Sequence, residues 1–163
     1  MEKLELRLKK GEEESGEAAS GHNEAPAVES DLYRLVVEHS HIGFLVIDDA
    51  YRAVYANQEL ARITGYAISE IIGRDFRDFM ADESRRLVSD RYIQRQLGRR
   101  LPRSYEVAIT CKDGGCRTVE ITVAVTRSSI GQSLTLVQVF DVSARKQIES
   151  ELAESRKKYQ DLF

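Results

Sequence analysis

The sequence lacks any long apolar run. Nowhere do about eighteen or more apolar residues follow one another, so it offers no candidate for a bilayer-spanning helix. The start, MEKLELRLKK, also lacks the apolar stretch and the small-residue cleavage site of a secretory signal peptide. Two cysteines in 163 residues exclude a disulfide scaffold and fit a reducing compartment. Together these absences predict a cytoplasmic chain with no membrane partner.

A strong excess of one charge is also missing. The formal net charge is −3, and residues 1–30 alone hold four Lys or Arg and eight Glu. A local run of arginines does occur over residues 85–103, where Asp90 is the single acidic residue. Its members are Arg85, Arg86, Arg91, Arg95, Arg99, Arg100 and Arg103. Because aromatic residues do not alternate with these arginines, the pattern favours a solvated helix face over a nucleic-acid surface. We therefore expect no nucleic-acid partner.

The motifs of catalysis and of metal binding are absent. There is no Walker loop, no nucleophile elbow, no paired metal ligands and no helical His-Glu phosphoacceptor segment. The three histidines, His22, His39 and His41, all precede the first predicted strand, where an imidazole cannot reach a haem on a pocket wall. The sequence thus predicts a chain that is not an enzyme, holds no metal and binds no His-ligated haem.

Composition divides the chain into three parts. Residues 1–30 are rich in Glu, Ala, Ser and Gly and poor in large apolar side chains, which predicts a disordered acidic leader. Residues 31–142 carry enough apolar periodicity for one core. Residues 143–163 predict a helical linker, because Ile148, Leu152, Ser155, Tyr159 and Leu162 follow heptad spacing with one polar position.

Periodicity within the middle part predicts helices. An amphipathic helix is expected over 32–39, with Ser30 or Asp31 as its N-cap. Asn57 is the expected N-cap of a second helix, which Gly65 ends. Further short helices are expected up to residue 80. A longer helix is then expected over 82–98, with four side chains facing inward: Leu87, Val88, Tyr92 and Leu97.

Five strands are expected in the same part of the chain. They cover 44–48, 52–56, 103–111, 116–127 and 133–140. The last is apolar on both faces, which is typical of a central strand. A two-residue turn between the third and fourth strands would set Cys111 opposite Cys116 but mix apolar with polar residues on both faces. A three-residue turn pairs Val107 with Val119 and keeps the pattern, so the cysteines should face opposite sides.

This order of elements, with three sequence stretches, resembles the PAS family of sensory domains. The stretches are GFLVIDDAYRAVYANQELARITGYAISEIIGRDF, YEVAITCKDGGCRTVEITV and LVQVFDVSARKQIESEL. The resemblance implies an α+β PAS fold: a five-stranded antiparallel sheet with short helices on one face, flanked by N-terminal and C-terminal helices. This chain differs from the family pattern at three positions. A Gly is common at the position of Tyr51, a Ser commonly caps the second short helix at the position of Ala67, and Ser143 replaces a Thr.

One stretch, EIIGRDFRDF, is similar to the light-sensing LOV subclass of that family. That subclass needs a reactive cysteine where this chain has Phe76. Without a nucleophile no flavin adduct can form, so a LOV-type photosensor is not expected and the cofactor stays unknown.

The resemblance implies a sensory and signal-transducing module, as in bacterial or archaeal sensor histidine kinases. A small ligand or partner would alter a pocket between helices and sheet. The candidate pocket residues are Leu60, Ile63, Phe76, Met80, Leu87, Ile109, Val123 and Leu136. Asp141, Ser143 and Arg145 would form the signalling junction, where coupling between Asp141 and Arg145 is expected. For each pocket candidate, plain core packing is the commoner role, since apolar periodicity does not distinguish a filled core from a cavity.

A second hypothesis is a ligand-free structural adaptor that dimerises and spaces neighbouring modules. Both hypotheses expect a homodimer, through the apolar side of the 32–39 helix and the heptad positions of the linker. The ending KYQDLF resembles LYRLVVEHS at the domain start, with Tyr33 and Tyr159 separated by 126 residues. A further module with a downstream effector is therefore expected after this chain.

Overall fold

The computed structural model describes residues 24–162, and the chain divides into two units between Val37 and Glu38. The described part of the first unit is helix α2, Glu24–Glu38, except for its last residue, which belongs to the second unit. This helix begins before the expected caps Ser30 and Asp31, so residues 24–30, which we predicted as the end of a disordered leader, are helical. Pro26 lies in the first turn, where a missing N–H costs nothing. The rest of the predicted leader, with His22, lies outside the described residues.

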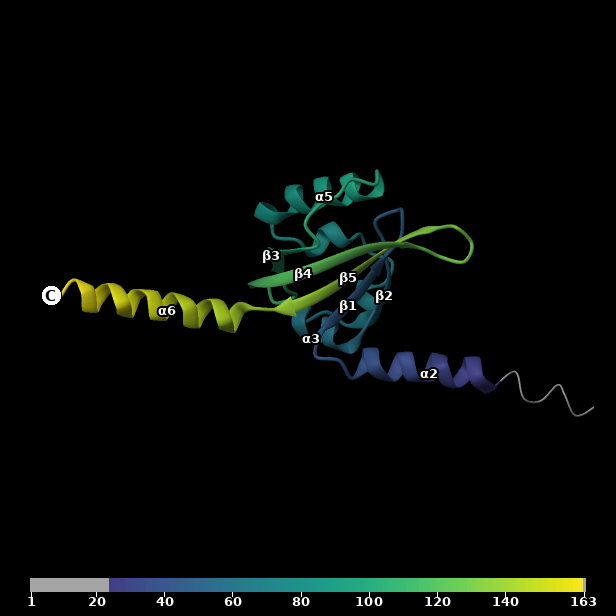
Figure 1. The fold of residues 1–163 in the computed structure, drawn as a ribbon, viewed down its shortest axis with the longest axis horizontal. Helices are drawn as coiled ribbons and strands as arrows, with labels where there is room; N and C mark the ends of the chain where they lie inside the picture. Colours follow the sequence, from purple (N-terminus) through teal and green to yellow (C-terminus); the bar gives the residue numbers. More distant parts are fainter. Residues whose placement is uncertain (1–23, 163) are drawn as a thin grey trace, which may run out of the picture. The chain divides into compact units, whose positions relative to one another are not determined.

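The second unit is built on one five-stranded antiparallel sheet. Its strands are β1 Gly43–Ile47, β2 Ala53–Ala56, β3 Ser104–Thr110, β4 Cys116–Arg127 and β5 Ser133–Asp141. Their order across the sheet is β2-β1-β5-β4-β3, as Figure 1 shows. β5 is central, with β1 on one side and β4 on the other, which confirms the prediction from its two apolar faces.

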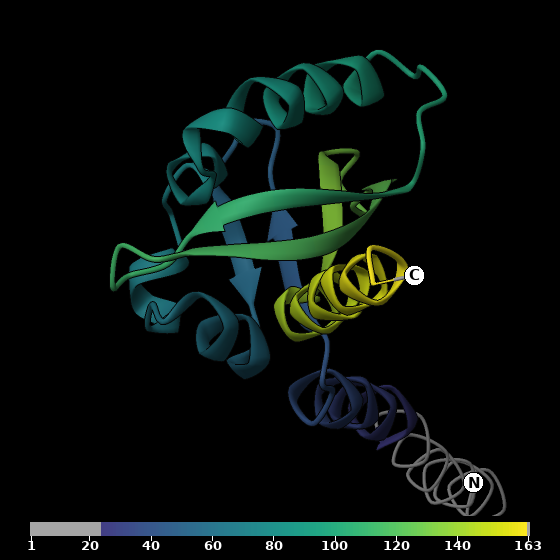
Figure 2. The ribbon, with the colours of Figure 1, turned by 90° about the vertical axis from the view of Figure 1, so that its left-hand side faces the viewer.

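Helices cover one face of this sheet. They are α3 Gln58–Thr64, α4 Ile68–Ile71, the 3-10 turn η1 Phe76–Phe79 and α5 Asp82–Gln96. Figure 2 shows α5 lying along the sheet, and the last helix, α6 Ser143–Gln160, leaving the end of β5. The α+β fold predicted from the sequence is confirmed. Among the described residues no helix combines the length and the apolar character needed to cross a membrane.

The β2–α3 corner depends on Asn57, which is fully buried. Its Oδ1 accepts hydrogen bonds from the N–H of Leu60, at 3.1 Å, and from the N–H of Phe44, at 2.8 Å. Its Nδ2 donates to the carbonyl of Ile42 at 2.9 Å. Asn57 therefore caps α3 and also holds the start of β1. At the other end of α3, Gly65 takes the left-handed conformation with φ 78°, as predicted.

The hairpin between β1 and β2 contains a left-handed residue that is not glycine. Tyr51 has φ 66°, a conformation that costs a side-chain-bearing residue about 1 kcal/mol. Its ring packs against Tyr92, with centroids 4.8 Å apart, and under the guanidinium of Arg77 at 4.1 Å. These contacts hold the Tyr51 ring at a turn position where the resemblance described above implies a glycine.

The β3–β4 hairpin has the register that the binary pattern predicts. Val107 lies opposite Val119, and the N–H of Cys111 donates to the carbonyl of Gly115 at 2.8 Å. Cys111 is buried and Cys116 is exposed, so the two thiols do not face each other. The three-residue turn is confirmed.

Helix α5 differs from the prediction in which residues it buries. The buried stripe of α5 consists of three residues spaced four apart, which are Ser84, Val88 and Tyr92. Leu87 and Leu97, predicted to face inward, are exposed by 43% and 69%. The other two predicted inward residues, Val88 and Tyr92, are buried, so the prediction is confirmed for them. The helix is strongly polar, and only the narrow stripe centred on Val88 faces the core.

Candidate functional site

The core of the second unit contains an apolar cavity of about 70 Å³ between the helices and the sheet. Five of the eight predicted pocket residues line it: Leu60, Phe76, Met80, Ile109 and Val123. Phe76 is 3% exposed and packs against Tyr92 with ring centroids 5.3 Å apart. The position that would carry a LOV cysteine therefore contributes an aromatic wall to the cavity.

The other three predicted pocket residues do not line the cavity. Ile63 is buried, and its side chain packs beside Gly43 at the start of β1. Leu136 lies between the buried residues Thr135 and Val137 of β5, so it projects to the opposite face of the sheet. Leu87 is exposed on α5. Leu87 and Leu136 were misplaced because apolar spacing determines neither the helix phase nor the inward face of a strand that is apolar on both sides. Ile63 has the plain core-packing role that we expected to be the commoner one.

Sequence reasoning missed the polar groups at the cavity. Thr64, Tyr92, Arg95, Tyr105 and Thr135 all line it. The hydroxyl of Tyr92 donates to the carbonyl of Asp48 at 2.6 Å, and burial raises the pKa of Tyr92. Alternation along β5 gives a usable signal for Thr135, because it shares a face with Val137 and Val139.

Two further polar residues hold α5 to β5 beside the cavity. The side-chain amide of Gln96 donates to Thr135 Oγ1 at 3.0 Å, and Ser133 Oγ donates to Gln96 Oε1 at 2.7 Å. Thr135 is 2% exposed, so this contact lies in the core. The rim of the cavity therefore has a polar connection between helix and strand that apolar periodicity does not predict.

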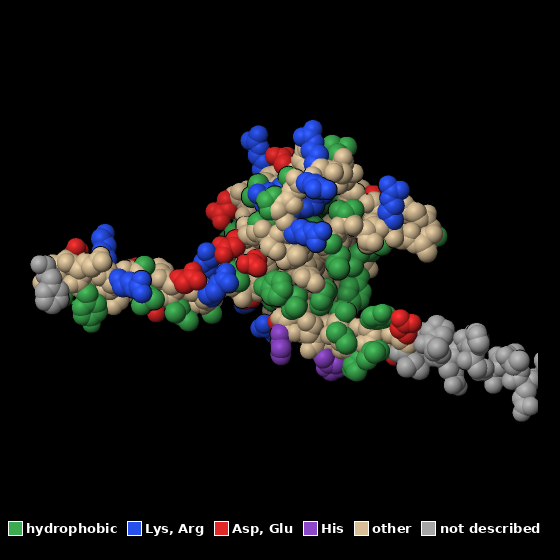
Figure 3. Space-filling view, viewed as in Figure 1, with side chains coloured by type: hydrophobic (Ala, Val, Ile, Leu, Met, Phe, Trp, Pro, Cys, Tyr) green, Lys and Arg blue, Asp and Glu red, His purple; other side chains and the backbone are tan. Residues whose placement is uncertain are grey.

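The arginine run does not behave as one solvated face. Arg85, Arg86, Arg99, Arg100 and Arg103 are exposed, and Figure 3 shows basic side chains gathered over α5. Arg91 and Arg95 differ, because both lie over the ring of Tyr105, at 4.1 Å and 5.4 Å. The prediction of a solvated face is wrong for these two residues.

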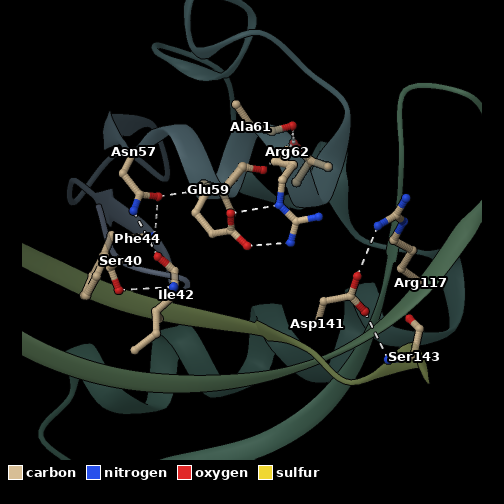
Figure 4. Close-up of polar contacts among 12 residues, drawn as sticks. Ser40, Ile42, Phe44, Asn57, Glu59, Ala61, Arg62, Arg117, Asp141 and Ser143 are labelled. Carbon is tan, nitrogen blue, oxygen red and sulfur yellow. Dashed lines mark hydrogen bonds and ion pairs between the residues drawn. The ribbon is translucent and has the colours of Figure 1, made fainter. Parts of the chain in front are cut away.

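Two of the three predicted junction residues, Asp141 and Ser143, meet at the end of β5, as Figure 4 shows. Asp141 Oδ1 accepts from the N–H of Ser143 at 3.0 Å, and Asp141 Oδ2 accepts from Arg117 Nη1 at 3.1 Å. Ser143 Oγ donates to the carbonyl of Thr118 at 3.2 Å. Burial by itself would raise the pKa of Asp141, but the hydrogen bonds from Ser143 and Arg117 outweigh it and lower that pKa. The first turn of α6 is thus fixed to both β5 and β4.

Arg145 belongs to the junction but does not contact Asp141. Its guanidinium lies 3.3 Å from Glu106 and 3.8 Å from Glu120, and Lys146 Nζ lies 2.7 Å from Glu106. The expected pair of Asp141 with Arg145 is replaced by Asp141 with Arg117. We name the four residues Glu106, Glu120, Arg145 and Lys146 the α6 latch. Glu106 and Glu120 could not be assigned to it from the sequence, because cross-strand register decides which acids lie beside the helix.

Neither of the described histidines, His39 and His41, lines the cavity. In the part of the chain that the structure describes, no group of three or more His, Cys, Asp or Glu side chains is placed to hold a metal ion. The chemistry available at the cavity is therefore apolar contact with a few hydroxyl and guanidinium groups.

Comparisons with known proteins agree with this architecture. A family model described as the PAS fold matches residues 31–140. The structure is similar to a PAS domain from a two-component sensor histidine kinase, at 15% identity and TM-score 0.60, over 71% of this chain and 98% of that chain. It is also similar to the PAS domain of an HTR-like protein from Haloarcula marismortui, at 22% identity and TM-score 0.57, over 72% and 97%.

A third similar structure comes from a sensory box histidine kinase/response regulator of Burkholderia thailandensis. The identity is 19% and the TM-score 0.59, over 79% of this chain and 98% of that one. At these identities the structural likenesses establish the fold, and the family match covers most of the chain.

Proposed function

We propose, from the premise that this chain belongs to the PAS-fold family, that it is a cytoplasmic sensory module for a small ligand. The ligand occupies the cavity, and the response passes along β5 into α6 and on to an effector outside this chain. Similar structures from sensor histidine kinases support an effector of that kind. In this proposal the chain itself is not an enzyme, and catalysis belongs to the effector.

The observation that carries the proposal is the continuity of β5. Thr135, Val137 and Val139 line the cavity, and the next residue of the same alternation is Asp141. Its carboxylate accepts a hydrogen bond from the N–H of Ser143 at the start of α6. A ligand that moves this wall therefore acts on the strand that ends at the junction. A joint with two states separated by a few kcal/mol would allow a modest ligand to shift their populations.

The output end of the module is α6. None of its residues is buried, and Ile148, Leu152 and Tyr159 are exposed by 65%, 53% and 66%. These apolar heptad positions fit a pairing of two copies, so we propose a homodimer in which α6, with the apolar residues of α2, transmits the change. Release or tightening of the α6 latch would change how the two helices pair.

A structural adaptor without ligand is the second candidate. The small size of the cavity, about 70 Å³, favours it, because such a space can also be a packing defect of a filled core. In the adaptor the exposed heptad positions of α6 serve only to join and space modules. The two candidates differ in whether the state of the cavity changes α6.

The test fills part of the cavity permanently by adding a methyl group to a lining side chain, in place of a bound ligand. Val123→Ile extends a cavity-lining side chain, while Val125→Ile adds the same methyl on the same strand at a position exposed by 41%. The sensor predicts that Val123→Ile, and not Val125→Ile, changes amide hydrogen exchange over residues 143–150. Native mass spectrometry of the purified chain would also reveal a co-purifying small molecule. If amide hydrogen exchange over residues 143–150 is equal in the two variants and no bound molecule is found, the sensor is refuted and the structural adaptor is the remaining candidate.

A further inference from the structure

We propose that the ligand of the cavity is a short-chain monocarboxylate whose carboxylate binds at Arg95 and Arg91. This inference rests on the proposed function, because it names the ligand class for the same cavity. Arg95 is the one basic side chain among the described lining residues, and it stands next to Tyr105 in an otherwise largely apolar wall. An apolar body with one anionic end matches that distribution.

A second arginine, Arg91, lies near this end of the cavity, although it is not one of the lining residues. The guanidinium carbons of Arg91 and Arg95 lie 4.1 Å and 5.4 Å from the centre of the same Tyr105 ring. Arg95 donates to the carbonyl of Pro102 and, at 3.4 Å, to the hydroxyl of Tyr105. Among residues 24–162 neither arginine forms an ion pair with a carboxylate. Two like charges held together repel each other, and a bound anion would remove that repulsion.

Arg91 also has an unsatisfied donor. Its Nη1 is buried and has no hydrogen-bond partner within the described residues. A guanidinium carries donors only, so the missing partner must be an acceptor, and a carboxylate accepts from guanidinium groups with good geometry. The buried Oε1 of Gln94 also lacks a partner among those residues. Rotation of Gln94 towards Arg91 would satisfy both atoms without a ligand, and substitution of Arg91 separates that arrangement from anion binding.

The volume limits the length of the apolar part. At about 70 Å³ the cavity is smaller than the roughly 150 Å³ of an apolar cavity that binds benzene. We therefore infer an acid of about three to four carbons, whose apolar part is smaller than benzene, since each further methylene needs space that the packed core does not offer. Longer aliphatic acids should bind more weakly.

The test compares acids with their uncharged counterparts on the whole chain. Isothermal titration calorimetry at pH 7 with butanoate, hexanoate and decanoate, and with 1-butanol and 1-hexanol, gives the ratio of acid to alcohol affinity. We expect each short acid to bind about tenfold or more tightly than its alcohol, since a hydrogen bond to a charged group gives a preference of that order. Hexanoate and decanoate should each bind at least about tenfold less tightly than butanoate.

Arg95→Gln and Arg91→Gln should each lower the acid-to-alcohol ratio by about tenfold while alcohol binding stays the same. Arg86→Gln is the matched control, because Arg86 is exposed on the same helix and outside the cavity lining. If Arg95→Gln does not fold, the ratio for the unmodified chain still decides the question. If Arg91→Gln leaves the ratio unchanged, the role of Arg91 is overturned and pairing with Gln94 explains its buried donor.

The outcomes separate this inference from the proposed function. Equal binding of acid and alcohol overturns the anionic ligand but keeps a ligand-binding cavity. The anionic ligand is likewise overturned, and the cavity kept, if neither binds while native mass spectrometry finds another bound molecule. If nothing binds and Val123→Ile leaves α6 unchanged, both the inference and the sensor are overturned.

Discussion

Glu106 of β3 lies directly opposite Glu120 of β4. Two acids in that position repel each other, and here Arg145 and Lys146 of α6 lie beside them at 2.7–3.8 Å. The sheet thus contains a repulsion that the docked first turn of α6 relieves. This relationship makes the position of α6 dependent on charge, and it leads to the first prediction.

The effect of Glu106→Gln should reverse sign with the state of the latch. In the unmodified chain the substitution removes partners of Arg145 and Lys146 and should cost about 0.5 kcal/mol, because these groups are largely solvated. In an Arg145→Ala/Lys146→Ala background it removes only repulsion and should stabilise by a few tenths of a kcal/mol, roughly 0.3. Urea unfolding of the four chains measures both values, and an equal effect in both backgrounds would refute the latch.

Asp141 should couple energetically to Arg117 and not to Arg145. Asp141 Oδ2 lies 3.1 Å from Arg117 Nη1, whereas Arg145 binds Glu106, Glu120 and Glu149. A double-mutant cycle of Asp141→Asn with Arg117→Gln should give about 0.5 kcal/mol of coupling. The matched cycle with Arg145→Gln should give a value near zero. Comparable coupling in the two cycles would contradict these contacts.

The contribution of Asp141 to stability should depend on pH. Burial would raise the pKa of this carboxyl, but hydrogen bonds from Ser143 and the charge of Arg117 lower it overall. A lowered pKa means that the carboxylate stabilises the fold above its unfolded value of about 3.9, and that this stabilisation is lost as pH falls through the folded value.

Asp141→Asn should therefore destabilise the chain at pH 7, by about 1 kcal/mol, and by progressively less below about pH 4. Chemical unfolding at a series of pH values tests this dependence. Asp113→Asn offers a control acid, because Asp113 lies in the exposed β3–β4 turn. A difference between Asp141→Asn and the unmodified chain that stays constant down to about pH 2 would exclude the mechanism.

Asn57 should be one of the more costly polar residues to remove. Asn57→Ala leaves the N–H groups of Leu60 and Phe44 and the carbonyl of Ile42 without their side-chain partner at a buried corner. We expect a loss of about 2–4 kcal/mol in the free energy of unfolding. Asn57→Asp keeps the acceptor but not the donor, so its loss should be smaller if the cap dominates. A loss below about 1 kcal/mol for Asn57→Ala would be inconsistent with so central a role for these three hydrogen bonds.

The two cysteines should differ sharply in reactivity. Cys116 is exposed, whereas Cys111 is buried and its burial raises the pKa of its thiol. Because the thiolate is the reactive form, a thiol reagent at about pH 8 should label Cys116 rapidly and Cys111 only when the fold opens. Cys116→Ser should abolish the fast phase, and Cys111→Ser should retain it. Two fast phases in the unmodified chain would contradict the hairpin register.

The sequence predicted those features that depend on one local rule. The register of β3 with β4 followed from keeping Val107 and Val119 on one face, and the α3 corner followed from the capping chemistry of Asn57 and Gly65. Prediction from the sequence was less successful where two neighbouring apolar residues could each have been the buried one. Val88 and Leu87 are neighbours on α5, and only packing against the sheet decides which is buried.

Candidate site residues were predicted less well than the fold. The cavity also depends on Thr135, Tyr105 and Arg95, whose polar side chains give no core signal in the sequence. The partners of α6 were missed for a related reason, since Glu106 and Arg117 come near it only through the pairing of β3, β4 and β5. Long-range register brings such residues together, and a single sequence does not show it.

The central place of β5 has a consequence for how the domain is made. β1 lies near the beginning of the domain and pairs with β5 at its end. The sheet can therefore form completely only after β5 has been synthesised, because Gly43 pairs with Val139. Such distant pairing carries a large loop-closure entropy and slows folding. During synthesis the β1–β2 hairpin therefore emerges long before its partner strand, and the sheet is completed only when the ribosome has released nearly the whole domain. Chaperone dependence should accordingly be greatest just before residue 141 leaves the exit tunnel.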